Sequence, residues 1–211
     1  MRRPKISSST RVGWIRLALG AATLGVALTV TGCGGSSSSG FDGAELATTI
    51  PVPDVTLTDT SGQPFNLAAQ AKDKLTLVYF GYTNCPDVCP TTMADLGTAL
   101  GKLEEGERSR VQVVFITTDP HDDTPAVLRK WLDSFNASFI GLTGDLKTVQ
   151  ATAAKLGVAA EDPTTDSEGH VTDTHGAQVI AFSPSDGRAH LVWLAGTTPT
   201  QYAHDIALLL A

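Results

Sequence analysis

Cysteine is scarce in this chain: only three of its 211 residues are cysteines, Cys33, Cys85 and Cys89. So few cysteines exclude a small domain that is held together by several disulfide bonds. The chain also contains no internal repeat. Its length beyond a short N-terminal segment instead fits one domain with a sizeable core.

Positive charge is also scarce beyond the N-terminus. The chain has 15 lysine and arginine residues against 22 aspartate and glutamate residues, and five of the basic residues lie within positions 2–16. Without those five, 10 basic residues face 22 acidic ones, and the formal net charge is 10 minus 22, or −12. No basic patch is left to attract a polyanion, so we exclude nucleic acid as a partner.

The first 33 residues have the pattern of an export signal. The basic segment precedes an apolar run from Leu17 to Val30, and Thr31 and Gly32 then stand before Cys33. This ending resembles a bacterial lipobox, in which Cys33 is lipidated and becomes the mature N-terminus. An uncleaved membrane-spanning helix is the alternative, but a span needs roughly 20 apolar residues and this run is shorter. Either anchor places the domain at the cell membrane, on its extracytoplasmic side.

A glycine- and serine-rich run follows the signal at Gly34–Gly40. It has too little apolar surface to pack, so we expect residues 34–48 to form a flexible tether. Residues 49–211 are expected to form the folded domain. A diacylated cysteine would hold that domain durably at the membrane.

The domain alternates short apolar runs with amphipathic segments. Strands are predicted over 51–59, 64–67, 75–80, 111–116, 178–182 and 191–195, with a short segment at 139–142; helices are predicted after Cys89, from Pro125, over 146–156 and from Pro199. The first two strands form an N-terminal β-hairpin and the last two form another. This order predicts an α/β fold, a thioredoxin-like sandwich whose central mixed β-sheet has helices on both faces.

Two thiols lie between the strand at 75–80 and the next helix, in a segment that we call the thiol turn (residues 81–90). Cys85 and Cys89 can direct both sulfurs to one point, and the helix N-terminus is expected to lower their pKa by favouring the thiolate. Such a pair can exchange disulfides or hold a soft metal such as Cu(I) or Zn(II), whereas Cu(II) also prefers imidazole nitrogen. A third ligand is therefore expected to be histidine.

The five histidines are His121, His170, His175, His190 and His204. His175 precedes a strand of the late hairpin, and in a thioredoxin-like sandwich that loop lies against the thiol turn. A histidine that only hydrogen-bonds within the loop is the alternative. His190 and His204 are expected to be solvated. Thioredoxin-like oxidoreductases usually have two residues between their cysteines and a proline where His175 stands, so the three-residue spacing and the absent proline favour metal over dithiol exchange.

A long motif surrounds the two thiols. It runs Tyr79-Phe80-Gly81-Tyr82-Thr83-Asn84-Cys85-Pro86-Asp87-Val88-Cys89-Pro90-Thr91, and Asp119-Pro120, Asp123-Thr124-Pro125 and His175 follow. In these residues the chain, from about Val52 to its end, resembles the Sco (SenC) family of copper-binding proteins. The resemblance implies a membrane-tethered thioredoxin fold that holds copper with Cys85, Cys89 and His175. It also implies a role in building the dinuclear copper site of cytochrome c oxidase.

The same resemblance places Asp87 and Asp119 near the site. Three positions depart from the family pattern: Asn84 stands where the family often has histidine, Thr174 where it usually has aspartate, and Asp122 where it often has arginine. A carboxylate next to a histidine can orient its imidazole. Asp173 is therefore a candidate to replace the missing aspartate, and His170 in the same loop is an alternative ligand.

Two functions follow from these residues. The first is a copper chaperone rather than an enzyme, which passes its metal by ligand exchange to the copper-bearing subunit of the oxidase or to another copper protein. The second is a thiol:disulfide oxidoreductase, in which Cys85 and Cys89 form a redox disulfide and reduce the cysteines of the acceptor. Only the first requires His175. A peroxidase is less favoured because no arginine lies near Cys85, and a structural disulfide because so short a loop restricts the unfolded chain little.

Overall fold

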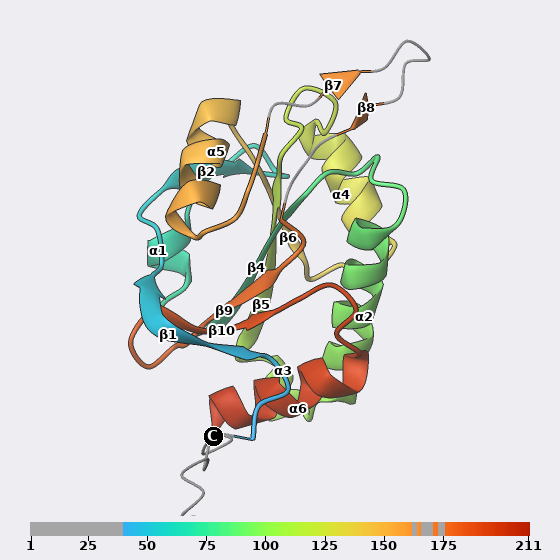
Figure 1. The fold of residues 1–211 in the computed structure, drawn as a ribbon. Helices are drawn as coiled ribbons and strands as arrows, with labels where there is room; N and C mark the ends of the chain where they lie inside the picture. The colour runs from blue at the N-terminus through green and yellow to red at the C-terminus, as the bar shows by residue number, and fades with distance from the viewer. Residues whose placement is uncertain (1–39, 162–163, 166–170, 173–175) are drawn as a thin grey trace, which may run out of the picture. The chain divides into compact units, whose positions relative to one another are not determined.

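The computed structural model describes residues 40–161, 164–165, 171–172 and 176–211. Its centre is an eight-stranded sheet in the order β1-β10-β9-β4-β5-β6-β2-β3 (Figure 1). The strands are β1 (Ala44–Pro51), β2 (Thr56–Asp59), β3 (Pro64–Asn66), β4 (Leu75–Gly81), β5 (Val111–Thr117), β6 (Ile140–Thr143), β9 (Val179–Phe182) and β10 (Arg188–Trp193). A separate pair joins β7 (Thr164–Thr165) and β8 (Val171–Thr172). The helices are α1 (Leu67–Gln70), α2 (Val88–Lys102), α3 (Glu105–Arg108), α4 (Pro125–Asp133), α5 (Leu146–Lys155) and α6 (Pro199–Leu210).

The sheet is mixed, as predicted. β4 pairs in parallel with β5, and β5 with β6, whereas β9 lies antiparallel to β4 on the other side. All seven residues of β4 are buried, because helices cover both faces of the sheet. Leu77 and Tyr79 join a core with α2, α4 and α6, while Val78 and Phe80 join a second core with α5. The predicted thioredoxin-like sandwich is confirmed.

Local signals in the sequence fix the ends of several helices. Thr124 caps α4 by accepting a hydrogen bond from the Val127 amide, and Pro125 occupies the first turn. Thr198 and Gln201 form a capping box at the start of α6. Gly157 follows α5 with a φ of +68°, a conformation in which glycine commonly ends a helix.

The first strand lies partly where a tether was predicted. Residues 44–48 belong to β1, which pairs antiparallel with β10, so the folded part of the chain begins before residue 49. Most of β1 is exposed or half-buried, and its register with β10 shifts between Glu45 and Ile50. An exposed edge strand of this kind has no clear alternation of apolar and polar residues, which is why the sequence pattern missed it. Across the described helices, none has the length and apolar character needed to cross a membrane.

Candidate metal centre

The thiol turn connects the end of β4 to the start of α2. Cys85 is half-buried and Cys89, in the first turn of α2, is 0% exposed; the two cysteines are not joined by a disulfide. The Cys89 amide donates a hydrogen bond to Cys85 Sγ over 3.4 Å. The helix N-terminus therefore brings the two cysteines together, as the spacing predicted.

Cys89 is enclosed by residues of β4. The Tyr79 hydroxyl donates a hydrogen bond to Cys89 Sγ over 3.5 Å. A Cβ added to Gly81 would lie 2.8 Å from the same sulfur and 2.8 Å from the Tyr79 ring, closer than real contacts allow. Only glycine leaves room at this position, so Gly81 allows Cys89 Sγ to pack directly against β4. The motif contained both residues, but the sequence did not assign them these roles.

The pKa of Cys89 moves in the direction opposite to the prediction. Burial raises the pKa of this thiol from 9.0 to about 12, although the hydrogen bond from Tyr79 acts to lower it. Desolvation of a thiolate thus outweighs the favourable helix N-terminus at this position. The metal-free site keeps a proton on Cys89 at neutral pH.

A buried carboxylate ties the thiol turn to the loop after β5. Asp123, 1% exposed, accepts hydrogen bonds from the Thr83 amide at 3.0 Å and the Thr117 hydroxyl at 2.5 Å. The Thr83 hydroxyl also donates to this carboxylate. Burial raises the pKa of Asp123. Because Thr83 lies two residues before Cys85, Asp123 fixes the start of the turn.

The two predicted aspartates differ in their surroundings. Asp87 is exposed and occupies the N-cap position of α2, where its side chain makes no capping hydrogen bond. Asp119 is 4% exposed and lies on the loop that Asp123 holds. Its Oδ1 accepts a hydrogen bond from the Asp122 amide at 3.4 Å, and its Oδ2 has no partner among the described residues. Asp119 is therefore a buried carboxylate close to Asp123, which links the thiol turn to the loop after β5.

Four predicted site residues lie outside the described residues: Cys33, His170, Asp173 and His175. The described chain resumes at Gly176, whose amide donates to the Ala159 carbonyl at 2.9 Å. It then enters β9, which runs antiparallel to β4 with Val78 opposite Ile180. The beginning of β9 consequently lies at the end of the sheet where β4 leads into the thiol turn.

The described histidines all contact carboxylates. His121 is 94% exposed and lies beside Asp122, while His190 is partly exposed and lies beside Asp186. His204 is exposed, as expected, and its Nδ1 also lies between the carboxylates of Asp42 and Asp205. In the described ranges, no third histidine, cysteine or carboxylate joins the thiols closely enough to complete a three-ligand site.

Comparison with known proteins agrees with this fold and motif. The profile of the SCO1/SenC family matches residues 45–211. An SCO2-like protein of Rickettsia felis is 39% identical over 105 residues, which is 50% of each chain. The copper-bound structure of Bradyrhizobium japonicum ScoI has a TM-score of 0.67 at 32% identity and covers 76% of this chain and 99% of that one. Apo Sco1 of Thermus thermophilus gives a TM-score of 0.65 at 34% identity, covering 80% and 94%.

The matches extend well beyond the thiol turn. The family profile covers most of the chain, from the second residue of β1 to the end of α6. The chain spans half or less of the length of its yeast and Rickettsia relatives, so the match concerns the domain that these proteins share. On the strength of the profile, the fold and the thiol motif, this chain belongs to the SCO1/SenC family.

Proposed function

We propose that this chain is a membrane-tethered, extracytoplasmic copper chaperone that holds copper with Cys85, Cys89 and His175. It delivers the metal to the dinuclear copper site of cytochrome c oxidase, through the copper-bearing subunit or another copper protein. Residues 1–33 act as the signal, and Cys33 carries the lipid. The observation that carries the proposal is the pair of neighbouring thiols at the start of α2, in a chain of this family.

The donor set suits copper in both of its oxidation states. Two thiolates are soft ligands that favour Cu(I), and an added imidazole suits Cu(II). Cys89 is protonated in the metal-free site, so copper binding releases its proton. The bond between the thiolate and the positive metal offsets the cost of burying the thiolate charge. Cys85 is only half-buried, so a ligand of the acceptor protein can approach the bound copper from the side of Cys85.

We assign the third ligand to His175 because of the direction in which the backbone continues from it. This residue comes directly before Gly176, and the chain then enters β9 at the end of the sheet that carries the thiol turn. Asp87 lies within the turn and Asp119 lies on the loop beside it. Asp173 takes the place of the aspartate that usually precedes the family's histidine. His170 is the alternative ligand from the same segment.

The test compares copper binding by the full chain in detergent with binding by His175→Ala. His121→Ala is the matched control, because His121 is exposed and, among the described residues, pairs with the neighbouring Asp122. We expect His175→Ala to weaken Cu(II) binding and to change the thiolate-to-copper absorption bands, with the control unchanged. If His175→Ala binds both copper states as tightly as the parent, the assignment of this ligand fails.

A second function is favoured by the unequal exposure of the thiols. An accessible Cys85 beside a buried Cys89 is the arrangement of an attacking and a resolving thiol, as in a thiol:disulfide oxidoreductase. Reduction of an acceptor's disulfide would oxidise Cys85 and Cys89 to a disulfide. This reaction does not use an imidazole. If disulfide reduction is the main function, His175→Ala should therefore still reduce a model disulfide at the parental rate.

A further inference from the structure

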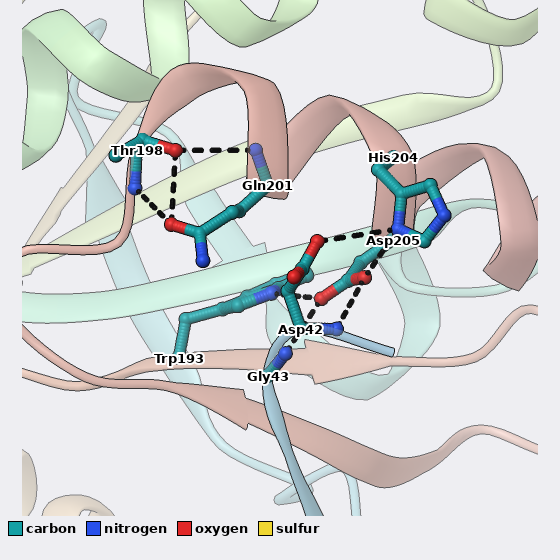
Figure 2. A network of polar contacts seen from close by, with 7 residues as sticks. All are labelled: Asp42, Gly43, Trp193, Thr198, Gln201, His204 and Asp205. Atoms are coloured by element: carbon teal, nitrogen blue, oxygen red, sulfur yellow. Dashed lines mark hydrogen bonds and ion pairs between the residues drawn. The ribbon is translucent and has the colours of Figure 1, made fainter. Parts of the chain in front are cut away.

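A second group of metal-ligating side chains lies far along the chain from the thiol turn. It joins Asp42, which precedes β1, to His204 and Asp205 on α6, and we call it the histidine cluster (Figure 2). His204 Nδ1 lies 3.3 Å from Asp42 Oδ2 and 3.1 Å from Asp205 Oδ1. The three ligand atoms all lie within 4.8 Å of one another.

Asp205 is the fixed member of this cluster. Its side chain is 0% exposed, and its Oδ2 accepts hydrogen bonds from Trp193 Nε1 at 2.7 Å and the Gly43 amide at 2.8 Å. Its Oδ1 accepts one from the Asp42 amide at 2.9 Å (Figure 2). These donors set the plane of the carboxylate and leave Oδ1 directed at the imidazole. Hydrogen bonds of this kind orient the ligands of metal sites.

The charge of the cluster is unbalanced. Two carboxylates face one imidazole, and among the described residues no lysine or arginine forms an ion pair with Asp42 or Asp205. A single Nδ1 proton serves only one of the two carboxylate oxygens well. A divalent cation at this point would balance both charges, and a buried carboxylate such as Asp205 is ordinarily paired with a cation or bound to a metal.

The distances suit a coordinated transition metal. Zinc bonds to imidazole nitrogen and carboxylate oxygen are about 2.0–2.2 Å long, so neighbouring ligand atoms lie roughly 2.9–3.5 Å apart. The two separations from His204 Nδ1, 3.1 Å and 3.3 Å, fall in this interval, and the two carboxylate oxygens lie within 4.8 Å of each other. His204 is 50% exposed and Asp42 is 40% exposed, which leaves one side of the cluster open to solvent and to an incoming ion.

We propose that the histidine cluster is a second metal site, for a divalent transition-metal ion such as Zn(II) or Cu(II). Its ligands are His204 Nδ1 and one oxygen from each of Asp42 and Asp205, and water fills the open positions. The nitrogen and oxygen donors select a harder ion than the thiol turn does. A bound ion fastens the segment before β1 to the last helix. This site does not depend on the proposed copper delivery.

Zn(II) is the probe, because it binds such donors without redox chemistry. Zn(II) binding is measured by calorimetry on the full chain in detergent, with both thiols removed as Cys85→Ser and Cys89→Ser. His204→Ala is compared with His190→Ala, the matched control, since His190 lies beside a single partly exposed carboxylate. Asp42→Asn tests the second ligand while keeping the backbone hydrogen bond to Asp205.

We expect the chain with Cys85→Ser and Cys89→Ser to bind one Zn(II) ion at this site. His204→Ala and Asp42→Asn should each weaken that binding at least about tenfold, since losing even a partner of a ligand costs 10–100-fold. His190→Ala should bind as the parent does. The proposal is overturned if the chain with Cys85→Ser and Cys89→Ser binds no Zn(II), or if adding His204→Ala leaves the binding unchanged. Should the double variant fail to fold, the same loss of one ion on His204→Ala is sought in the thiol-containing chain.

Discussion

The thiol turn and the histidine cluster are assembled in opposite ways. The thiols lie four residues apart in one strand-to-helix connection, so a local motif contains both of them. The cluster joins residues 163 positions apart, and only the packing of the segment before β1 against α6 brings them together. The first site buries sulfur, and the second buries a carboxylate. Local motifs therefore reveal soft-metal sites readily, whereas sites made by long-range packing need the fold.

The largest expected effect is a loss of copper binding at the thiol turn that leaves Zn(II) binding at the histidine cluster unchanged. Replacing both thiols, as Cys85→Ser with Cys89→Ser, removes two of the three proposed copper ligands. We expect Cu(I) affinity to fall at least about 100-fold, measured by competition with a chromophoric chelator. Zn(II) binding at the histidine cluster should persist. Copper binding at parental strength would contradict the placement of the site at the thiol turn.

The next effect tests the buried carboxylate of the cluster. Asp205→Ala leaves Trp193 Nε1 and the amides of Asp42 and Gly43 without their acceptor. We expect a loss of about 3 kcal/mol in the free energy of unfolding, since each unsatisfied buried group costs roughly 1–3 kcal/mol. Urea denaturation measures this value. The control Asp186→Ala, at an exposed turn, should stay within about 0.5 kcal/mol of the parent.

A smaller loss in the free energy of unfolding is expected for a substitution at Gly81, where β4 packs against the buried thiol of Cys89. Gly81→Ala forces a methyl group against Cys89 Sγ and the Tyr79 ring, and such overpacking costs about 1–3 kcal/mol. It should also weaken copper binding while Zn(II) binding at the cluster is kept. Gly101→Ala in α2 is the control, because no neighbouring group of the described residues lies within 4 Å of its added Cβ. Equal stability of the two variants would show that Cys89 does not rest against β4.

The smallest effect is a dependence of stability on alkaline pH. The folded state raises the pKa of Cys89 from 9.0 to about 12, so between these values it binds more protons than the unfolded chain. Stability contributed by this proton is complete below pH 9 and declines as the pH rises toward 12. At pH 10 the loss is on the order of 1 kcal/mol. Urea midpoints at pH 8 and pH 10 measure it, and Cys89→Ser should remove this part of the decline.

Much of the fold could be predicted from the sequence because its signals are local. The uninterrupted apolar run of β4 predicted a central strand, and the Thr124-Pro125 pair predicted the start of α4. β1 could not be predicted, since its partner β10 lies far away in the sequence and its residues are mostly exposed. Its position depends on a long-range pairing that no local pattern records.

The candidate site shows the same division. The positions of Cys85 and Cys89 followed from their spacing, but the pKa of Cys89 did not. Helix dipole and burial act in opposite directions on a thiol, and the sequence does not say how completely the sulfur is enclosed. Likewise, the sequence indicated an exposed His204 but not its contact with the buried Asp205, whose burial depends on Trp193 and on the segment before β1.

The two outermost strands of the sheet bear on how these molecules behave when crowded. An open strand edge invites pairing with another copy of the chain, which leads to aggregation. β3 closes one edge with three residues beginning at Pro64, which has no amide hydrogen to donate. β1 closes the other edge, where the shifted register after Glu45 interrupts the ladder. Both edges therefore resist lateral pairing with another copy of the chain.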